Sequence, residues 1–452
     1  TIGLFQVESR AQQASLPRMK PERFYDLVVQ VAIVRPGPIE GKMAHPYLKR
    51  RQGREPAEPL HECLREILDR TLGVPLFQEQ LLRVAMRAAN FTGGEAEELR
   101  RAFGFKRSEK RMKELEGRLR SGMTSNGIVG EPQEKILKAI ASFAMFGFPE
   151  SHAASFALLA YSSAWLQVHY RGPFTCALLN NQPMGFYGPS TLIKDSQRHG
   201  LRVLPIDINR SGAICTVEDP CVRLGFNYVR GLDKKTANLI QSAQPFETIA
   251  DLSRRVPELT RTDIETLAAI GALNSVGAKH RRDALWQASW LSKPAAELLD
   301  ESPEPAPEAP LRQMTLDERL VSDHLGAGLT IGRHPMSYRR AEMNKLRVVP
   351  AAKLASVPNG RIVRVAGNII VRQRPGTAKG ILFLSLEDDT GISNVVIKPE
   401  LFASQRLAIL AHPWVMVEGK MQNVDSVIHV LARKIMPLPN PLEIGQGSHD
   451  FH

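Results

Sequence analysis

The sequence predicts a multidomain chain that is mainly α-helical and ends in a small all-β barrel of the OB-fold type. Three observations lead to this prediction. Apolar residues recur at helical spacing through residues 1–205, two related helix–turn–helix phrases lie within 206–292, and short β-rich runs fill 355–436. The length of 452 residues agrees with several domains, because a single domain usually spans ~100–200 residues.

Residues 1–205 are predicted to be helical. "PERFYDLVVQVAIVRPGP" is an apolar helix that ends at two prolines, which cannot continue the hydrogen-bond ladder. "FTGGEAEELRR" opens on Thr92 and Glu95, whose spacing predicts a capping box. In "ESHAASFALLAYSSAWLQVHY", residues 150–170, apolar side chains recur three or four apart. We expect one buried helix face there, formed by Ala154, Leu158, Tyr161, Trp165 and Val168.

Residues 206–292 are predicted to form one module of two helix–turn–helix units. "RGLDKKTANLI" resembles a helix-hairpin-helix, in which Gly231 turns the hairpin and Lys234 and Lys235 add charge for DNA phosphates. Asp233 stands where that motif usually has a second glycine. The second unit keeps Gly271 but has no lysine directly after it. A helix pair used only for packing is the alternative.

Residues 293–354 are predicted to be an acidic, proline-rich linker followed by a connecting segment, because "KPAAELLDESPEPAPEAP" cannot bury a core. Residues 355–436 then show five β-rich runs with one helical stretch after the third, which is the layout of an OB-fold. Residues 437–452 form a tail.

The loop after the first barrel strand is a candidate single-strand-binding site. Arg372, Arg374 and Lys379 fall within "RQRPGTAKG", where basic residues and stacking aromatics are expected together. Phe383 is the obvious aromatic candidate, because Phe402 falls on the helix and Trp414 has the pattern of a core residue.

The charge balance favours a polyanionic partner. The chain carries 59 Lys and Arg against 47 Asp and Glu, a net charge of +12, and nucleic acid is the commonest such partner. A merely basic protein is the alternative. No apolar run approaches the ~18 residues of a membrane helix. The four cysteines form no C-x-x-C pair, which argues against disulfides or structural zinc and favours the cytoplasm.

A basic helix is the other candidate binding site. Arg100, Arg101 and Lys106 follow the predicted helix start, and such groups bind phosphate oxygens without losing a proton. The alternative is a solvated face that pairs with neighbouring glutamates such as Glu97. His152 has no partner at metal or catalytic spacing, so its pattern favours packing at a helix start.

Several phrases, in the same order, are similar to the fingers region of bacterial C-family DNA polymerases, the replicative alpha subunits: "GLFQVESRAQ", "RPGPIEG", "FQEQ", "LRRAFGFKR" and "GFPESHAASFALLAYSSAW". "LLNNQPMGFYGPSTLIKDSQRHGLRVLPIDIN", "RQRPGTAKGILFLSLEDDTGISNVVI" and "HDFH" resemble the error-prone, damage-inducible subclass. The resemblance covers nearly the whole chain. It implies fingers over 1–205, a tandem helix-hairpin-helix module over 206–292 and an OB domain over 355–436.

The resemblance also assigns roles. It implies that Arg100, Arg101 and Lys106 meet the triphosphate of the incoming nucleotide, and that His152 lines the same pocket without transferring protons. Arg35 joins this group at the fingers–palm junction, which Glu8 also shapes. The implied activity is template-directed DNA synthesis across lesions, with primer-template DNA and deoxynucleoside triphosphates as substrates.

Two departures qualify these expectations. The family holds Mg²⁺ on three palm aspartates, two of them as D-x-D, and no D-x-D occurs in this chain. We therefore expect the palm and PHP domain to lie upstream of Thr1, and this chain alone to be inactive. Asp388 and Asp389 have the pattern of a hairpin turn, not of a metal site.

The second departure concerns partners. Gln313-Met314-Thr315-Leu316 lacks the aromatic end of a clamp-binding peptide, so the sliding clamp is expected to be reached indirectly. The subclass works with a catalytically inactive Y-family-like partner and a RecA-like factor. Two other interpretations stay open: a non-catalytic DNA-binding adaptor, and a fragment with no independent role.

Overall fold

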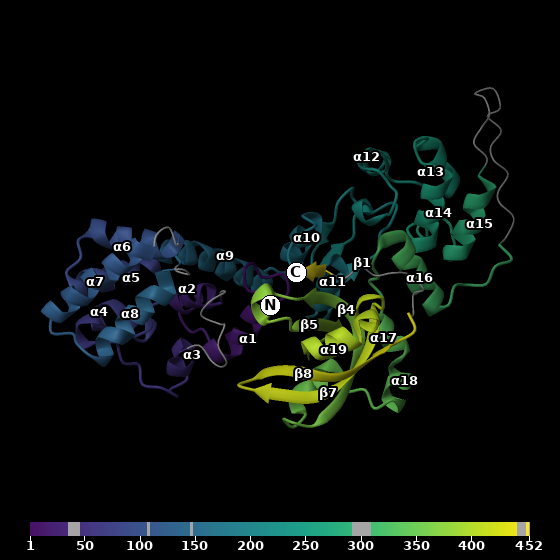
Figure 1. The fold of residues 1–452 in the computed structure, drawn as a ribbon. Coiled ribbons are helices and arrows are strands. Elements are labelled where there is room, and N and C mark those ends of the chain that lie inside the picture. Colours follow the sequence, from purple (N-terminus) through teal and green to yellow (C-terminus); the bar gives the residue numbers. More distant parts are fainter. Residues whose placement is uncertain (35–45, 106–108, 145–147, 292–308, 441–448, 452) are drawn as a thin grey trace.

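The structure is a computed structural model that describes residues 1–34, 46–105, 109–144, 148–291, 309–440 and 449–451. A helical lobe forms one end, a small mixed module forms the other, and the barrel lies beside the central helices (Figure 1). The predicted fold class, helices followed by an OB-type barrel, is confirmed.

The helical lobe begins the chain and packs in two clusters, one around α2 and α9 and one around α5 to α8. The predicted capping box starts α6: the Thr92 N–H donates to Glu95 Oε2 at 2.7 Å, and the Glu95 N–H donates to Thr92 Oγ1 at 3.3 Å. The elements are α1 (Arg10–Met19), α2 (Phe24–Ile33), α3 (Pro46–Arg51), η1 (Glu62–Leu64), α4 (Arg65–Leu68), η2 (Asp69–Thr71), α5 (Gln78–Ala89), α6 (Gly93–Phe105), α7 (Glu109–Ser125), α8 (Glu131–Ala144), α9 (Glu150–His169), α10 (Arg171–Asn180) and α11 (Pro189–Arg198).

The predicted buried face of α9 is wrong. Ala153 and Ala157 pack with the α2 residues, and their small side chains allow the two helices to approach closely. Ala160 is also buried. Four of the residues expected inside are instead exposed: Leu158, Tyr161, Trp165 and Val168. Spacing alone did not separate the two faces, because apolar residues occupy both.

The module after α11 wraps a continuous apolar core that also takes in Cys176 and Leu179 of α10 and Ile193 of α11. Its small sheet has the order β1-β3-β2, with β1 parallel and β2 antiparallel to β3. The short helix η3 leads through a turn into α12, and α14 leads through a turn into α15, so two helix–turn–helix units are present as predicted. The elements are β1 (Arg202–Leu204), β2 (Thr216–Glu218), β3 (Cys221–Arg223), η3 (Phe226–Tyr228), α12 (Lys234–Ala243), α13 (Ile249–Arg255), α14 (Arg261–Ile270) and α15 (Arg281–Trp290).

The connecting segment is a packed part of the fold. A capping box between Thr315 and Glu318 starts its first helix, and Gly328, with a φ of 71°, ends it. Leu320, Met336 and Met343 pack against the barrel residue Trp414, which is buried as predicted. The elements are α16 (Leu316–Ala327), α17 (Pro335–Tyr338), α18 (Arg340–Lys345) and η4 (Ala351–Ser356).

The barrel has the five predicted strands, with helices after the third. Its strand order is β5-β6-β8-β7-β4, and a further pairing of β4 with β5 closes the barrel. Alternate residues such as Val365, Leu384 and Val417 fill the interior. The elements are β4 (Ile362–Gln373), η5 (Gly376–Ala378), β5 (Leu382–Glu387), β6 (Ile392–Ile397), α19 (Pro399–Ser404), α20 (Arg406–Leu410), β7 (Trp414–Val424), β8 (Val427–Pro437) and β9 (His449–Phe451), which adds to β4 in parallel.

Buried polar contacts join the barrel to the rest of the chain. Glu387, at the end of β5, accepts hydrogen bonds from Arg198 Nη2 at 2.7 Å and from Thr191 Oγ1 at 3.0 Å, both on α11. Burial raises the pKa of Glu387, while Arg198 and Thr191 act in the opposite direction. At the β7–β8 hairpin, Asp425 pairs with Arg18 of the helical lobe at 3.6 Å and also with Arg54.

Replacing Arg198 should weaken this junction. Arg198→Ala leaves the buried Glu387 without its cationic partner, and we expect the free energy of unfolding to fall by about 3–5 kcal/mol. Chemical denaturation measures the change. Arg65→Ala is the matched control, because its ion pair with Glu62 is exposed and should leave stability unchanged. Equal stability of the two variants would contradict a structural role for the buried pair.

Candidate nucleic-acid interface

The first hairpin of the module presents a turn and a capped helix start. Gly231 has a φ of 86°, a left-handed conformation that favours glycine, and it is exposed. Asp233 caps α12: its Oδ1 accepts from the N–H groups of Lys235 at 2.8 Å and Thr236 at 2.9 Å. Hydrogen bonds from Thr236 and from the backbone lower the pKa of Asp233. These two donors are therefore already satisfied, while the side chains of Lys234 and Lys235 are exposed, and their contact with phosphate stays a prediction.

The second hairpin is built differently. Gly271 ends α14 with a φ of 85°, and its N–H donates to Ala268 O at 3.0 Å. The positive φ favours glycine at this position, and a Cβ there would lie 2.8 Å from Arg281 Nε, so the arginine side chain would have to shift. The geometry thus gives Gly271 a structural role, and its contact with DNA stays a prediction.

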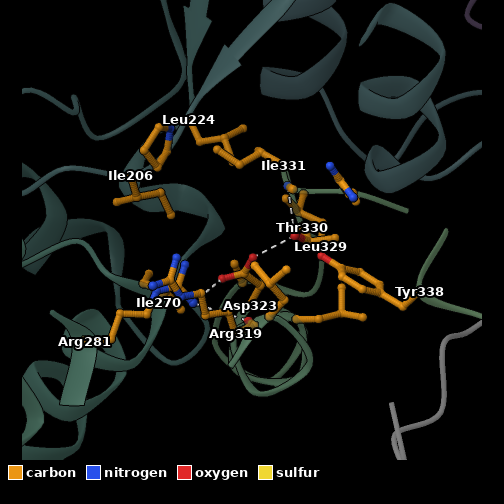
Figure 2. A pocket seen from close by; sticks show the side chains of 16 residues that line it. Ile206, Leu224, Ile270, Arg281, Arg319, Asp323, Leu329, Thr330, Ile331 and Tyr338 are labelled. Atoms are coloured by element: carbon orange, nitrogen blue, oxygen red, sulfur yellow. Dashed lines mark hydrogen bonds and ion pairs between the residues drawn. The ribbon is translucent and has the colours of Figure 1, made fainter. Parts of the chain in front are cut away.

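A cavity of about 500 Å³ lies between this module and the connecting segment (Figure 2). Its walls include Ile206 and Ile270 from the module and Leu329 from the connecting segment. Across it, Arg281 pairs with Asp323 at 2.7 Å, and Asp323 accepts from Thr330 Oγ1 at 2.7 Å. None of the residues predicted to bind nucleotide or DNA lines this cavity.

Arg100 and Arg101, two of the residues predicted to bind the nucleotide, both pair with Glu97. Arg100 donates to it twice, from Nε at 2.9 Å and from Nη2 at 2.7 Å, and Arg101 Nε donates at 3.0 Å. The Arg100 guanidinium, helped by Arg101, lowers the pKa of Glu97 to about 2. The pairing that the sequence left as an alternative is therefore present. Glu97 is the shared partner of both guanidinium groups. The Arg101 side chain is 69% exposed, so its charge stays accessible to solvent.

His152 lies exposed in the first turn of α9, between two aromatic rings. Its ring centroid is 4.9 Å from that of Phe148 and 4.3 Å from that of Phe156. This setting agrees with packing at a helix start. Arg35 and Lys106, the remaining predicted nucleotide-binding residues, lie outside the described residues.

Glu8 is a buried structural residue. It accepts from the Gly3 N–H at 2.5 Å and from the Phe186 N–H at 3.2 Å, and burial raises its pKa. It therefore fixes the first residues of the chain against the loop before α11. Its predicted place at the fingers–palm junction is not tested by these contacts.

The barrel residues predicted to lie on one loop divide between strand and loop. Arg372 belongs to β4 and is buried, and its Nε donates to Ile409 O at 3.1 Å, so placing it on the loop is wrong. The strand runs two residues further than its apolar pattern because Arg372 pairs with β5 on one side and β9 on the other. Arg374 is exposed and lies over the Phe402 ring at 4.8 Å. Lys379 is exposed beyond it.

The predicted groups occupy separate places. Arg100 and Arg101 lie on α6 in the helical lobe, Lys234 and Lys235 start α12 at the opposite end, and the barrel lies beside the elements between them (Figure 1). The capping role of Asp233 was missed. The spacing of Asp233 and Thr236 before an apolar helix was the signal that indicates such a cap.

Carboxylates of the described residues do not gather into a metal site. No group of three or more His, Cys, Asp or Glu side chains suited to a metal occurs there. Asp388 forms the predicted turn, accepting from Thr390 and from the Gly391 N–H at 2.9 Å, and its other oxygen accepts from Arg340 at 3.0 Å. These residues therefore do not fit a pair of Mg²⁺ ions.

The arrangement defines a protein that combines two nucleic-acid-binding modules with a helical lobe, and sequence comparisons agree. Residues 1–127 match the bacterial DNA polymerase III alpha subunit finger domain, 200–284 match a helix-hairpin-helix motif and 354–438 match an OB-fold nucleic acid binding domain.

Curated relatives match along the whole chain. Those named error-prone DNA polymerase from Alkalilimnicola ehrlichii, Corynebacterium efficiens and Dechloromonas aromatica are each 45% identical over 100% of this chain. The chain spans 45%, 42% and 44% of their lengths. The chain is therefore similar to part of the bacterial C-family DNA polymerases, and the relatives that it matches are named error-prone DNA polymerase.

Comparison with solved structures adds nothing to this assignment. Asparaginyl-tRNA synthetase from Pyrococcus horikoshii is 21% identical over 22% of this chain and 26% of its own, with a TM-score of 0.16. Among the described residues, no helix has the length and apolar character needed to cross a membrane.

Reversing the charge of the first hairpin tests its role. Lys234→Glu with Lys235→Glu should weaken duplex binding and flatten its salt dependence, because each lost phosphate contact lowers the log–log slope by about one. Fluorescence anisotropy at several salt concentrations measures both quantities. Lys345→Glu with Lys353→Glu, two exposed lysines outside the module, controls for the same change in net charge. An unchanged slope in the double variant would leave the hairpin with packing alone.

Proposed function

We propose that this chain is the part of an error-prone DNA polymerase that holds primer-template DNA and the incoming deoxynucleoside triphosphate during synthesis across lesions. The supporting observation is that a fingers-like lobe, a helix-hairpin-helix module and an OB barrel occur in one chain, which resembles error-prone polymerases throughout. The basic net charge of +12 agrees with a polyanionic substrate.

The chemical step is assigned to residues outside this chain. Phosphoryl transfer requires metal ions held by carboxylates beside the attacking and leaving oxygens. The described carboxylates do not fit that task, so we derive no step through Mg²⁺ here. On this proposal this chain alone binds substrate without extending a primer.

Within the chain, the helical lobe receives the triphosphate. Glu97 holds the Arg100 guanidinium in a bidentate pair, which fixes its orientation on α6. A triphosphate carries more negative charge than one carboxylate, so it competes for Arg100 and Arg101 when it arrives. His152 serves as a wall residue, and Lys106 and Arg35 complete the proposed set.

Duplex and template contacts are assigned to the other two parts. Lys234 and Lys235 meet duplex phosphates without reading sequence. Arg374 and Lys379, exposed at the barrel surface, meet single-stranded template, with Phe383 as a half-buried stacking candidate. We assign Arg372 no direct contact because its side chain is buried.

The proposed partners are a catalytically inactive Y-family-like protein and a RecA-like factor, and the sliding clamp is reached indirectly. The geometry near residue 315 supports indirect contact with the sliding clamp. Thr315 caps α16, so Gln313–Leu316 runs into a helix and is not a free extended peptide. We place the protein in the cytoplasm, where these substrates occur.

A DNA-binding adaptor is the second candidate function. It is favoured by the lack of a metal-suited carboxylate cluster among the described residues. It does not account for the fingers-like residues 1–127, because an adaptor has no need of a nucleotide pocket.

Kinetics of a double variant test the nucleotide assignment. The assay uses this chain joined to the upstream part of the Alkalilimnicola ehrlichii relative, called here the longer polypeptide. Arg100→Ala with Arg101→Ala should raise KM for nucleotide or lower kcat, since each lost phosphate contact costs about 1.5–3 kcal/mol, or ~10- to 150-fold in kcat/KM. Steady-state primer extension measures both constants.

Arg120→Ala is the control for this experiment. Arg120 is also paired with glutamates, Glu116 and Glu134, but it lies on α7 outside the proposed set. Its kinetics should match those of the unmodified protein. Unchanged constants in the double variant would remove Arg100 and Arg101 from the nucleotide site.

A further inference from the structure

Helix α9 has the composition of a buried helix but an exposed surface. It spans 20 residues, Glu150–His169, and no Asp, Glu, Lys or Arg occurs between Ser151 and Tyr170. Six of its large apolar residues are exposed and define what we call the α9 apolar surface: Leu158, Leu159, Tyr161, Trp165, Leu166 and Val168.

This surface continues onto neighbouring segments. Phe24, at the start of α2, is exposed and meets Tyr161 edge to face, with ring centroids 6.3 Å apart. Trp165 lies 5.4 Å from the exposed ring of Tyr170. In Figure 1, α9 runs from the helical lobe toward α10. The apolar residues therefore form one continuous patch along α9, between the helical lobe and α10.

Water is a poor environment for such a patch. A helix that is apolar on nearly every side is buried in a stable protein, and large contiguous apolar patches mark sites of contact. Elsewhere in this lobe the exposed helix faces carry ion pairs, such as Arg120 with Glu116 and Lys135 with Glu131. The contrast indicates that α9 is not built to face solvent.

We propose that the α9 apolar surface is the docking surface for the remainder of the longer polypeptide, the part that precedes Thr1. Two observations select this occupant. The chain spans only 45% of the Alkalilimnicola ehrlichii relative, so more than half of such a protein is available to cover the surface. The first residues also lie against α9, where Gln167 Nε2 donates to Ile2 O at 2.9 Å.

This inference rests on the proposed function, because that function makes the remaining part the catalytic half. Docking on this surface would then place the catalytic half along α9, the helix that also carries His152. The surface buried is apolar and contiguous, which suits a permanent intramolecular interface better than a transient partner.

Cysteine labelling tests the inference without any activity assay. Val168 is 70% exposed, so Val168→Cys should fold normally and react rapidly with a maleimide in this chain alone. In the longer polypeptide we expect the rate at this position to fall at least tenfold. Peptide mass spectrometry separates it from the native cysteines. Cys215 is fully buried, so its labelling would report any unfolded protein.

Leu407→Cys is the matched control. Leu407 is 76% exposed on α20, and its rate should be the same in both proteins. An undiminished rate at Val168→Cys in the folded longer polypeptide would overturn the inference, as would equal slowing at both positions. Slowing that depends on concentration in this chain alone would also overturn it, by assigning the surface to a second copy.

This design distinguishes failure of the proposed docking surface from failure of the proposed function. Protection of Val168→Cys in a longer polypeptide that extends no primer would retain the docking surface and reject the function. Primer extension without protection would retain the function and reject the docking surface.

Discussion

One buried carboxylate, Glu387, joins the barrel to helix α11. Its partners Arg198 and Thr191 are both on α11, a helix whose other face belongs to the core of the hairpin module. Lys194 of the same helix donates to Gly332 O in the connecting segment, and burial lowers the pKa of Lys194 to about 8. Helix α11 therefore contacts the module, the connecting segment and the barrel, and buried polar contacts add to the apolar packing between these parts.

This support joins parts of the chain that lie far apart in the sequence. Lys234 of the module and Arg374 of the barrel are far apart in sequence, yet both belong to units that are fixed on α11. A second contact, from Asp425 to Arg18 and Arg54, holds the tip of the barrel against the helical lobe. Two separate sets of contacts therefore position the barrel relative to the rest of the chain.

Local patterns allowed much of the fold to be predicted from the sequence. The five barrel strands, the capping box at Thr92, the Asp388 turn and the burial of Trp414 all depend on neighbouring residues, and all are confirmed. Contacts between distant segments were not predictable. Arg198 and Glu387 are 189 residues apart, Arg372 is buried by strand pairing on both sides, and the burial of α9 was assigned to the wrong face because both faces are apolar.

The nucleotide and DNA assignments came from resemblance, and geometry refines them. Glu97 holds Arg100 in a bidentate pair, and Asp233 accepts from the backbone N–H groups of Lys235 and Thr236 at the start of α12. The central claim is that this chain holds substrate while the chemistry lies outside it. Primer extension on a primed template with Mg²⁺ tests that claim most directly, using this chain alone and then the longer polypeptide. The account predicts DNA binding without extension by the chain alone and extension by the longer polypeptide. Measurable extension by the chain alone would contradict it, because carboxylates within these 452 residues would then have to hold the metal ions.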